Sequence, residues 1–116
     1  MGNPIKRQRV LTHLSKLEAD IALLQETRLE EIEAMKLRRG WVGQVYFSPA
    51  VHKKNGVVIL VHKRLNATLV SQEIDTDGRW IFIKLLIDQI PISILNVYGP
   101  TKVDNQFFGT NLLKFF

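Results

Sequence analysis

Apolar positions near the start of the chain recur with the period of an α-helix. Between Pro4 and Glu18 the apolar residues at helical spacing are Val10, Leu11, Leu14 and Leu17. Pro4 suits a first turn, because its missing N–H would have no helical partner there. The pattern predicts an amphipathic helix over 4–18, which Asp20 would end.

The segment that follows is apolar at every position instead of alternating. Residues 21–24 read IALL, which is typical of a strand covered on both faces. A helix leading into such a strand indicates an α/β arrangement. A second, short helix is expected from Leu29 to Arg38, stopped by Gly40.

After Gly40 the period changes to that of strands. Five runs rich in β-branched and aromatic residues follow at close spacing: WVGQVYFS, GVVILVH, NATLVSQEI, WIFIKLLI and PISILNVY. Short turns separate them, at His52–Gly56 and at DTDGR, so antiparallel pairing is expected. A further helix is expected from about Asp104, with apolar residues at Phe107, Phe108, Leu112, Leu113, Phe115 and Phe116.

Length and composition indicate one modest globular domain, or a piece of one. The chain has 116 residues, 46% of them hydrophobic and 23% charged. It has no cysteine, which excludes disulfides and cysteine-bound zinc. No signal peptide and no run of ~20 apolar residues is evident. A soluble, intracellular protein without a membrane partner is expected, with nucleus and cytoplasm both open.

The charge favours a polyanionic partner. The formal net charge is +5 and the pI is about 9.8, as in many nucleic-acid-binding domains. Candidate contacts are Lys6, Arg7, Arg9 and Arg28. The alternative is that the cations near the N-terminus only solvate one helix face.

Two polar residues stand at the ends of buried strands. Glu26 follows the run IALL, and Tyr98 ends the last strand before a Gly-Pro turn. Strand ends that converge on one edge are where α/β folds build sites. A carboxylate with a nearby tyrosine suits Mg²⁺ completed by water and phosphate oxygens. The alternative is an ordinary solvated strand end, since charged residues are common there. The three histidines, His13, His52 and His62, show no spacing typical of a metal site or a triad.

Four segments in order carry a family likeness: IKRQRVLTHLSKLEADIALLQET, NGVVILVHK, DGRWIFIKL and ISILNVYGP. Together they resemble the endonuclease/exonuclease/phosphatase superfamily, whose fold is that of DNase I. Within it the chain looks most like the apurinic-type endonuclease domain of long interspersed retrotransposon polyproteins, which also encode a reverse transcriptase. The resemblance runs from about Pro4 to about Pro100.

The resemblance implies roles for individual residues. Glu26 of the Gln-Glu-Thr motif corresponds to the family's magnesium-binding carboxylate, and Tyr98 to the active-site tyrosine near the scissile phosphate. Asn96 and Pro100 would shape the strand end. Gly56 and the turn over 77–79 would be structural. The fold implied is α/β (α+β), a partial four-layer α/β sandwich forming the first half of a DNase I-like fold.

The chain departs from the family pattern in several places. The family's first strand, with an asparagine near the metal, is missing, and Asn3 does not replace it. Thr101 and Arg28 stand where relatives carry asparagine and histidine. The Gly-Asp-Phe-Asn motif and the final Asp-His pair are also missing. Residues 1–116 are therefore expected to be the N-terminal part of such a domain, truncated at both ends.

These departures leave three expectations for function. The first is a fragment of a magnesium-dependent DNA endonuclease, inactive by itself because catalytic groups fail as a unit, with magnesium binding weak or absent. The second is a non-catalytic nucleic-acid-binding module that also uses Lys53, Lys54, Lys63 and Arg64. The third is a relic without function. A truncated sandwich would also expose sheet faces and could self-associate.

Overall fold

A computed structural model describes residues 3–98 of the chain. In these residues two helices precede and interrupt a series of strands: α1 (Pro4–Lys16), β1 (Ile21–Leu24), α2 (Glu31–Met35), β2 (Val42–Ser48), β3 (Val57–His62), β4 (Ala67–Ile74), β5 (Trp80–Ile87) and β6 (Ile90–Val97). Neither helix is long and apolar enough to cross a membrane. The helix expected from near Asp104 lies outside the described residues.

The strands form two three-stranded sheets. The first has the order β1-β3-β2 and the second the order β4-β5-β6. Every pair is antiparallel, which confirms the pairing expected from the short turns. β3 is the centre of the first sheet, and its residues 57–61 are all buried, as its apolar run predicts.

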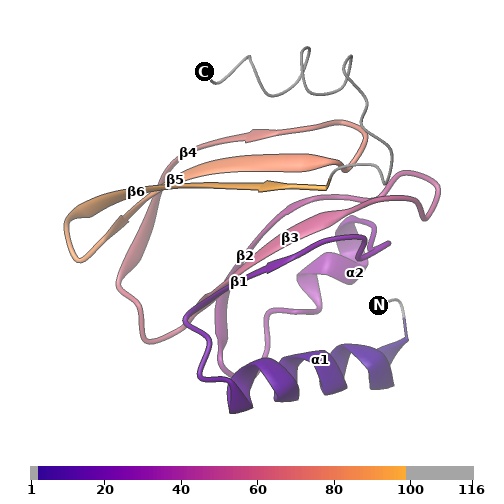
Figure 1. The fold of residues 1–116 in the computed structure, drawn as a ribbon, viewed down its shortest axis with the longest axis horizontal. Helices are drawn as coiled ribbons and strands as arrows, with labels where there is room; N and C mark the ends of the chain where they lie inside the picture. The colour runs from indigo at the N-terminus through magenta and orange to yellow at the C-terminus, as the bar shows by residue number, and fades with distance from the viewer. Residues whose placement is uncertain (1–2, 99–116) are drawn as a thin grey trace.

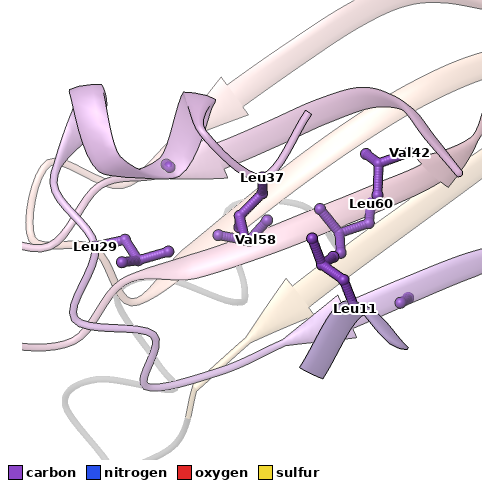
Figure 2. Close-up of a cluster of buried hydrophobic side chains, with 8 residues drawn as sticks. Leu11, Leu29, Leu37, Val42, Val58 and Leu60 are labelled. Carbon is purple, nitrogen blue, oxygen red and sulfur yellow. The ribbon is translucent and has the colours of Figure 1, made fainter. Parts of the chain in front are cut away.

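The described residues stack in three layers, with the helices on one face of the first sheet and the second sheet on the other (Figure 1). One core lies between the helices and the first sheet and includes Leu11, Leu37 and Leu60 (Figure 2). The other lies between the sheets and includes Ile59 of β3 and Ile83 of β5. Alternate residues of β3 thus face opposite cores, because side chains alternate along a strand. The fold is α+β and is consistent with a partial DNase I-like domain.

α1 begins as expected and ends two residues early. The Asn3 side chain accepts a hydrogen bond from the Ile5 amide at 2.8 Å and caps the helix. At the other end Glu18 adopts a left-handed conformation, with φ 57°. The amides of Glu18 and Ala19 then bond to the Ser15 and Leu14 carbonyls, which is the Schellman arrangement. The left-handed residue Glu18 therefore ends the helix, and the expectation that Asp20 ends it is wrong.

α2 is shorter than the pattern over 29–38 predicts. Glu30 is extended and the helix begins at Glu31. After Met35 the amides of residues 36–38 bond to carbonyls three residues back, so the chain tightens into a 3₁₀-type turn. Leu29 and Leu37 still bury their side chains, because packing onto the first sheet does not require them to be helical.

β1 is an edge strand and is only partly covered. Leu23 keeps 45% of its surface exposed, whereas Ala22 is buried. The expectation that this strand is covered on both faces is therefore wrong at Leu23. An apolar run of four residues does not distinguish an edge from a central strand, because its exposure depends on what packs beside it.

Candidate functional site

Glu26 and Tyr98 meet at one edge of the two sheets. The Tyr98 hydroxyl donates a hydrogen bond to Glu26 Oε1 at 3.1 Å, across 72 positions of sequence. Glu26 lies just beyond the carboxyl end of β1, and Tyr98 directly follows the carboxyl end of β6. These two strand ends lie on the same side of the molecule (Figure 1). We call this edge, residues 25–28, 52–56 and 96–98, the rim.

Backbone hydrogen bonds hold both residues in place. The Thr27 amide donates to the Gly56 carbonyl at 3.0 Å, and the Arg28 amide to the Asn55 carbonyl at 2.8 Å. These bonds attach the chain after β1 to the start of β3. The Tyr98 amide donates to the Arg79 carbonyl at 2.7 Å, which continues the β5–β6 pairing. The two side chains therefore project from fixed backbone.

Two side-chain amides join the sheets directly behind this pair. Asn96 Nδ2 donates to the Leu24 carbonyl at 3.1 Å and to the Val58 carbonyl at 2.9 Å. Gln25 Nε2 donates to the Val97 carbonyl at 2.8 Å and lies 3.3 Å from Asn96 Oδ1. Asn96 is buried, with 1% of its surface exposed. Its bonds link strand β6 of the second sheet to β1 and β3 of the first, and so set the separation of Glu26 and Tyr98.

Gly56 lets the rim segments pack this closely. Its φ is +92°, and a Cβ added to it would lie 2.7 Å from Thr27 Oγ1. Its amide donates to the Gly78 carbonyl at 2.7 Å. A side chain here would be strained by its backbone conformation and would also collide with a buried neighbour.

Backbone strain is concentrated at the rim. Eight described residues other than glycine have a positive φ. Five of them lie here: Glu26, Arg28, His52, Lys53 and Asn55. His52 and Lys53 are the central residues of a two-residue turn that Val51 and Lys54 close by mutual backbone hydrogen bonds, whereas Glu26, Arg28 and Asn55 belong to no such turn. Such conformations cost free energy and persist only where surrounding contacts hold them, which is common at binding and catalytic sites.

The same residues, together with Lys54, line an open cavity with an excess of positive charge. The cavity has a volume of about 400 Å³ and is lined by Glu26, Arg28, His52, Lys53, Lys54 and Asn55. Three of these side chains are cations and one is a carboxylate. Lys53 is also 3.3 Å from Glu33 Oε1 on α2. An open cavity of this composition suits an anion with several oxygens, such as a phosphate group.

The contact with Glu26 changes the chemistry of Tyr98. The hydrogen bond to the Glu26 carboxylate raises the pKa of the Tyr98 phenol above its usual value of 10.0, and partial burial and the carboxylate charge add to it. Arg28 opposes the shift. Tyr98 therefore stays protonated near neutral pH and serves as a hydrogen-bond donor.

The rim fits a hydrated metal ion better than a cage made only of protein groups. Within residues 3–98 no group of three or more His, Asp or Glu side chains comes together. Glu26 is the carboxylate that lines the cavity. Mg²⁺ commonly binds through one or two carboxylates and takes its other ligands from water and substrate phosphates. Glu26 could hold such an ion, with the three cations positioned for the phosphate.

The other candidate contacts with nucleic acid are dispersed. Lys6 and Arg9 are exposed on α1, in the helical layer, whereas Arg28 lines the rim cavity. Arg7 retains only 8% of its surface exposed and is poorly placed to reach a large ligand. Lys63 and Arg64 follow β3, and Arg64 pairs with Asp20. Pro100 and Thr101 lie outside the described residues.

Sequence reasoning missed two parts of the rim. The sequence does not identify Gln25 as a link between the sheets, and the one local signal for that role is a glutamine directly after an apolar strand. It indicates Lys53 and Lys54 only as general nucleic-acid contacts in a turn. Nothing local to HKKNG indicates that this turn lies beside Glu26, because the backbone pairing of residues 55–56 with 27–28 brings them together.

A comparison with known families assigns the chain to a family. The model of the Endonuclease/Exonuclease/phosphatase family matches residues 1–111. Enzymes of this family generally depend on a divalent metal. The match covers nearly the whole chain, including both sheets and the rim. The chain therefore belongs to the endonuclease/exonuclease/phosphatase family.

Proposed function

We propose that the rim is part of the active site of a magnesium-dependent endonuclease that hydrolyses phosphodiester bonds in DNA. The observation that carries this proposal is the hydrogen bond from Tyr98 to Glu26 beside a cavity lined by three cations. A phosphodiester needs positive charge around its oxygens and a carboxylate to hold the metal. The family of the chain makes nuclease chemistry the first choice.

In this proposal each side chain has a distinct task. Glu26 holds the metal ion, which when bound supplies charge neutralisation at the phosphate. Tyr98 remains protonated, and its one O–H group donates to the Glu26 carboxylate and so orients it. Arg28, Lys53 and Lys54 bind phosphate oxygens and fix the position of the strand.

We also propose that the chain of 116 residues binds DNA but does not cleave it. Among residues 3–98 the rim cavity has a single carboxylate for the metal, and His52 is its one histidine, the side chain that most often acts as a general base. Residues that form a catalytic unit fail together. The remaining groups would come from a further segment of a longer domain. Supercoiled plasmid incubated with the chain and Mg²⁺ should remain intact, and nicking that disappears in Glu26→Ala would contradict this.

The metal site is tested by binding. The affinity for a short DNA duplex is measured by fluorescence anisotropy in MgCl₂ and in NaCl of equal ionic strength. Mg²⁺ should strengthen binding severalfold, and Glu26→Gln should remove that gain. Glu31→Gln, which removes an exposed carboxylate on α2, is the matched control and should retain it. A gain that survives Glu26→Gln would exclude Glu26 as the ligand.

The second candidate function is non-catalytic binding of nucleic acid, which the excess of cations over carboxylates in the cavity favours. Binding would then weaken steeply with salt and be unaffected by Mg²⁺ and by Glu26→Ala. If the chain is instead a relic without function, urea unfolding followed by the fluorescence of Trp41 and Trp80 should show no cooperative transition.

The ordered motifs also support an origin in a long interspersed retrotransposon. Under this proposal the genomic DNA that flanks the reading frame should encode reverse-transcriptase motifs. Flanking DNA that instead encodes an unrelated single-copy gene would contradict it.

A further inference from the structure

A second basic surface lies on α1, away from the rim. An open groove of about 570 Å³ runs between this helix and the turn that carries Arg39. Its polar lining consists of Gln8, Arg9, Thr12, His13, Lys16 and Arg39. None of these residues lines the cavity at Glu26, and no carboxylate is among the described residues that line the groove.

The charge of α1 is unusual for a helix. Its 13 residues include no Asp or Glu, and its first turns carry Lys6, Arg7 and Arg9. Acidic side chains are favoured near a helix N-terminus and cations near the C-terminus, because of the helix dipole. Arg7 is buried in the fold, whereas the exposed Lys6 and Arg9 destabilise this end of the isolated helix, so folding alone does not account for those two.

The cations of the groove are available to a ligand. Among residues 3–98, Arg9, Lys16 and Arg39 form no ion pair, and all three are exposed. Arg9 and Lys16 are seven residues apart, which corresponds to about 10 Å along a helix axis. Phosphates on one DNA strand follow one another every ~3.4 Å along the duplex axis, so the groove can face several of them.

We propose that this groove is a second binding site for a phosphate backbone, which holds one strand of a nucleic acid independently of Glu26. The choice of nucleic acid rests on the proposed function, whereas the site rests on the groove itself. Arginine side chains bind phosphate oxygens through two parallel N–H groups. Gln8 and Thr12, whose side chains are 3.2 Å apart, add the neutral donors that phosphate contacts often use.

Three variants of equal charge change test the proposal. The groove variant is Arg9→Gln/Lys16→Gln/Arg39→Gln, and the rim variant is Arg28→Gln/Lys53→Gln/Lys54→Gln. The control variant, Lys36→Gln/Arg38→Gln/Lys84→Gln, removes three exposed cations outside both cavities. Affinity of the full chain for a labelled duplex of about 20 base pairs is measured by anisotropy between about 50 and 200 mM NaCl.

A plot of log affinity against log salt concentration has a negative slope. In the groove variant this slope should become less steep by about 2.7, as expected for three lost phosphate contacts. Its affinity for the duplex at the lowest salt concentration should fall by about tenfold or more. The control variant should change the slope by less than about 1. If the groove and control variants behave alike, the proposal is wrong.

Two further outcomes separate this proposal from its alternatives. A loss confined to the rim variant would overturn the groove and leave the proposed active site intact, and a loss confined to the groove variant would do the reverse. Poly-glutamate is added as a competitor at equal charge concentration. Competition as effective as that of unlabelled duplex would identify the partner as an acidic protein segment and contradict the assignment to nucleic acid.

Discussion

The β5–β6 hairpin and the rim both contain residues in the left-handed conformation, but for different reasons. At the hairpin, Asp88 and Gln89 have φ values of 51° and 69°. A two-residue hairpin turn requires this geometry at both positions to match the twist of its strands. At the rim, His52 and Lys53 form a turn of the same kind, closed by Val51 and Lys54. The conformations of Glu26, Arg28 and Asn55 belong to no such turn and accompany pairing between distant segments.

Chemistry accompanies the strain in one region only. The rim joins its strained backbone to three cations, a carboxylate and a tyrosine. The hairpin turn ends in exposed Asp88 and Gln89 and lines none of the cavities described above. At Glu26, Arg28 and Asn55 the strain comes from tertiary contacts and not from a turn type, and reactive groups converge there.

The largest expected effect comes from Gly56→Ala. The new methyl group would lie 2.7 Å from Thr27 Oγ1, on a backbone with a φ of +92°. We therefore expect the free energy of unfolding to fall by about 3 kcal/mol. Gly40→Ala is the matched control, because its φ is +60° and nothing lies within 4 Å. It should cost about 1 kcal/mol. Urea unfolding followed by tryptophan fluorescence measures the free energy of unfolding of both variants. An equal loss in the two would show that a side chain at residue 56 meets no close neighbour.

Replacing strained residues with ones that tolerate a positive φ should change the stability differently at the hairpin turn and at the rim. Asp88→Asn/Gln89→Gly supplies the favoured pair for this hairpin turn and should stabilise the protein by about 0.5–1 kcal/mol. Asn55→Gly relieves strain at the rim but removes the bond from Asn55 Nδ2 to the Asp77 carbonyl. We expect no net gain there, because the lost hydrogen bond contributes about 1 kcal/mol. Stabilisation of equal size at both sites, measured by urea unfolding, would contradict the difference between them.

The smallest effect is on the titration of Tyr98. Its folded pKa is raised, chiefly by the hydrogen bond to Glu26, so Glu26→Gln should lower that pKa toward 10.0. The stabilisation linked to the shift is fully present below pH 10 and is lost as the pH rises through the folded pKa. The wild type should therefore lose more stability at high pH than Glu26→Gln.

Ultraviolet titration of the phenols measures this effect. Tyr46, whose pKa is raised by burial, is the internal control and should titrate alike in both proteins. An unchanged Tyr98 pKa in Glu26→Gln would mean that the two side chains do not pair in solution.

Much of the fold follows from local patterns. The bounds of β5 agree with the run WIFIKLLI, and β2, β3, β4 and β6 differ from their predicted runs by one residue at most at each end. Both helices are shorter than predicted. Their ends depend on single backbone conformations, at Glu18 and at Glu30, that apolar spacing does not encode.

The sequence by itself determined the element types, the antiparallel pairing, the family and the two residues at the strand ends. These follow from side-chain period, turn length and short motifs, all of which are local. Only the tertiary structure decided that Tyr98 bonds to Glu26, that Asn96 joins the sheets and that the Lys53–Lys54 turn lines the same cavity. Those contacts connect segments separated by 27 (Arg28 to Asn55) to 72 (Glu26 to Tyr98) positions, and such separations become contacts only when both sheets pack on their shared core.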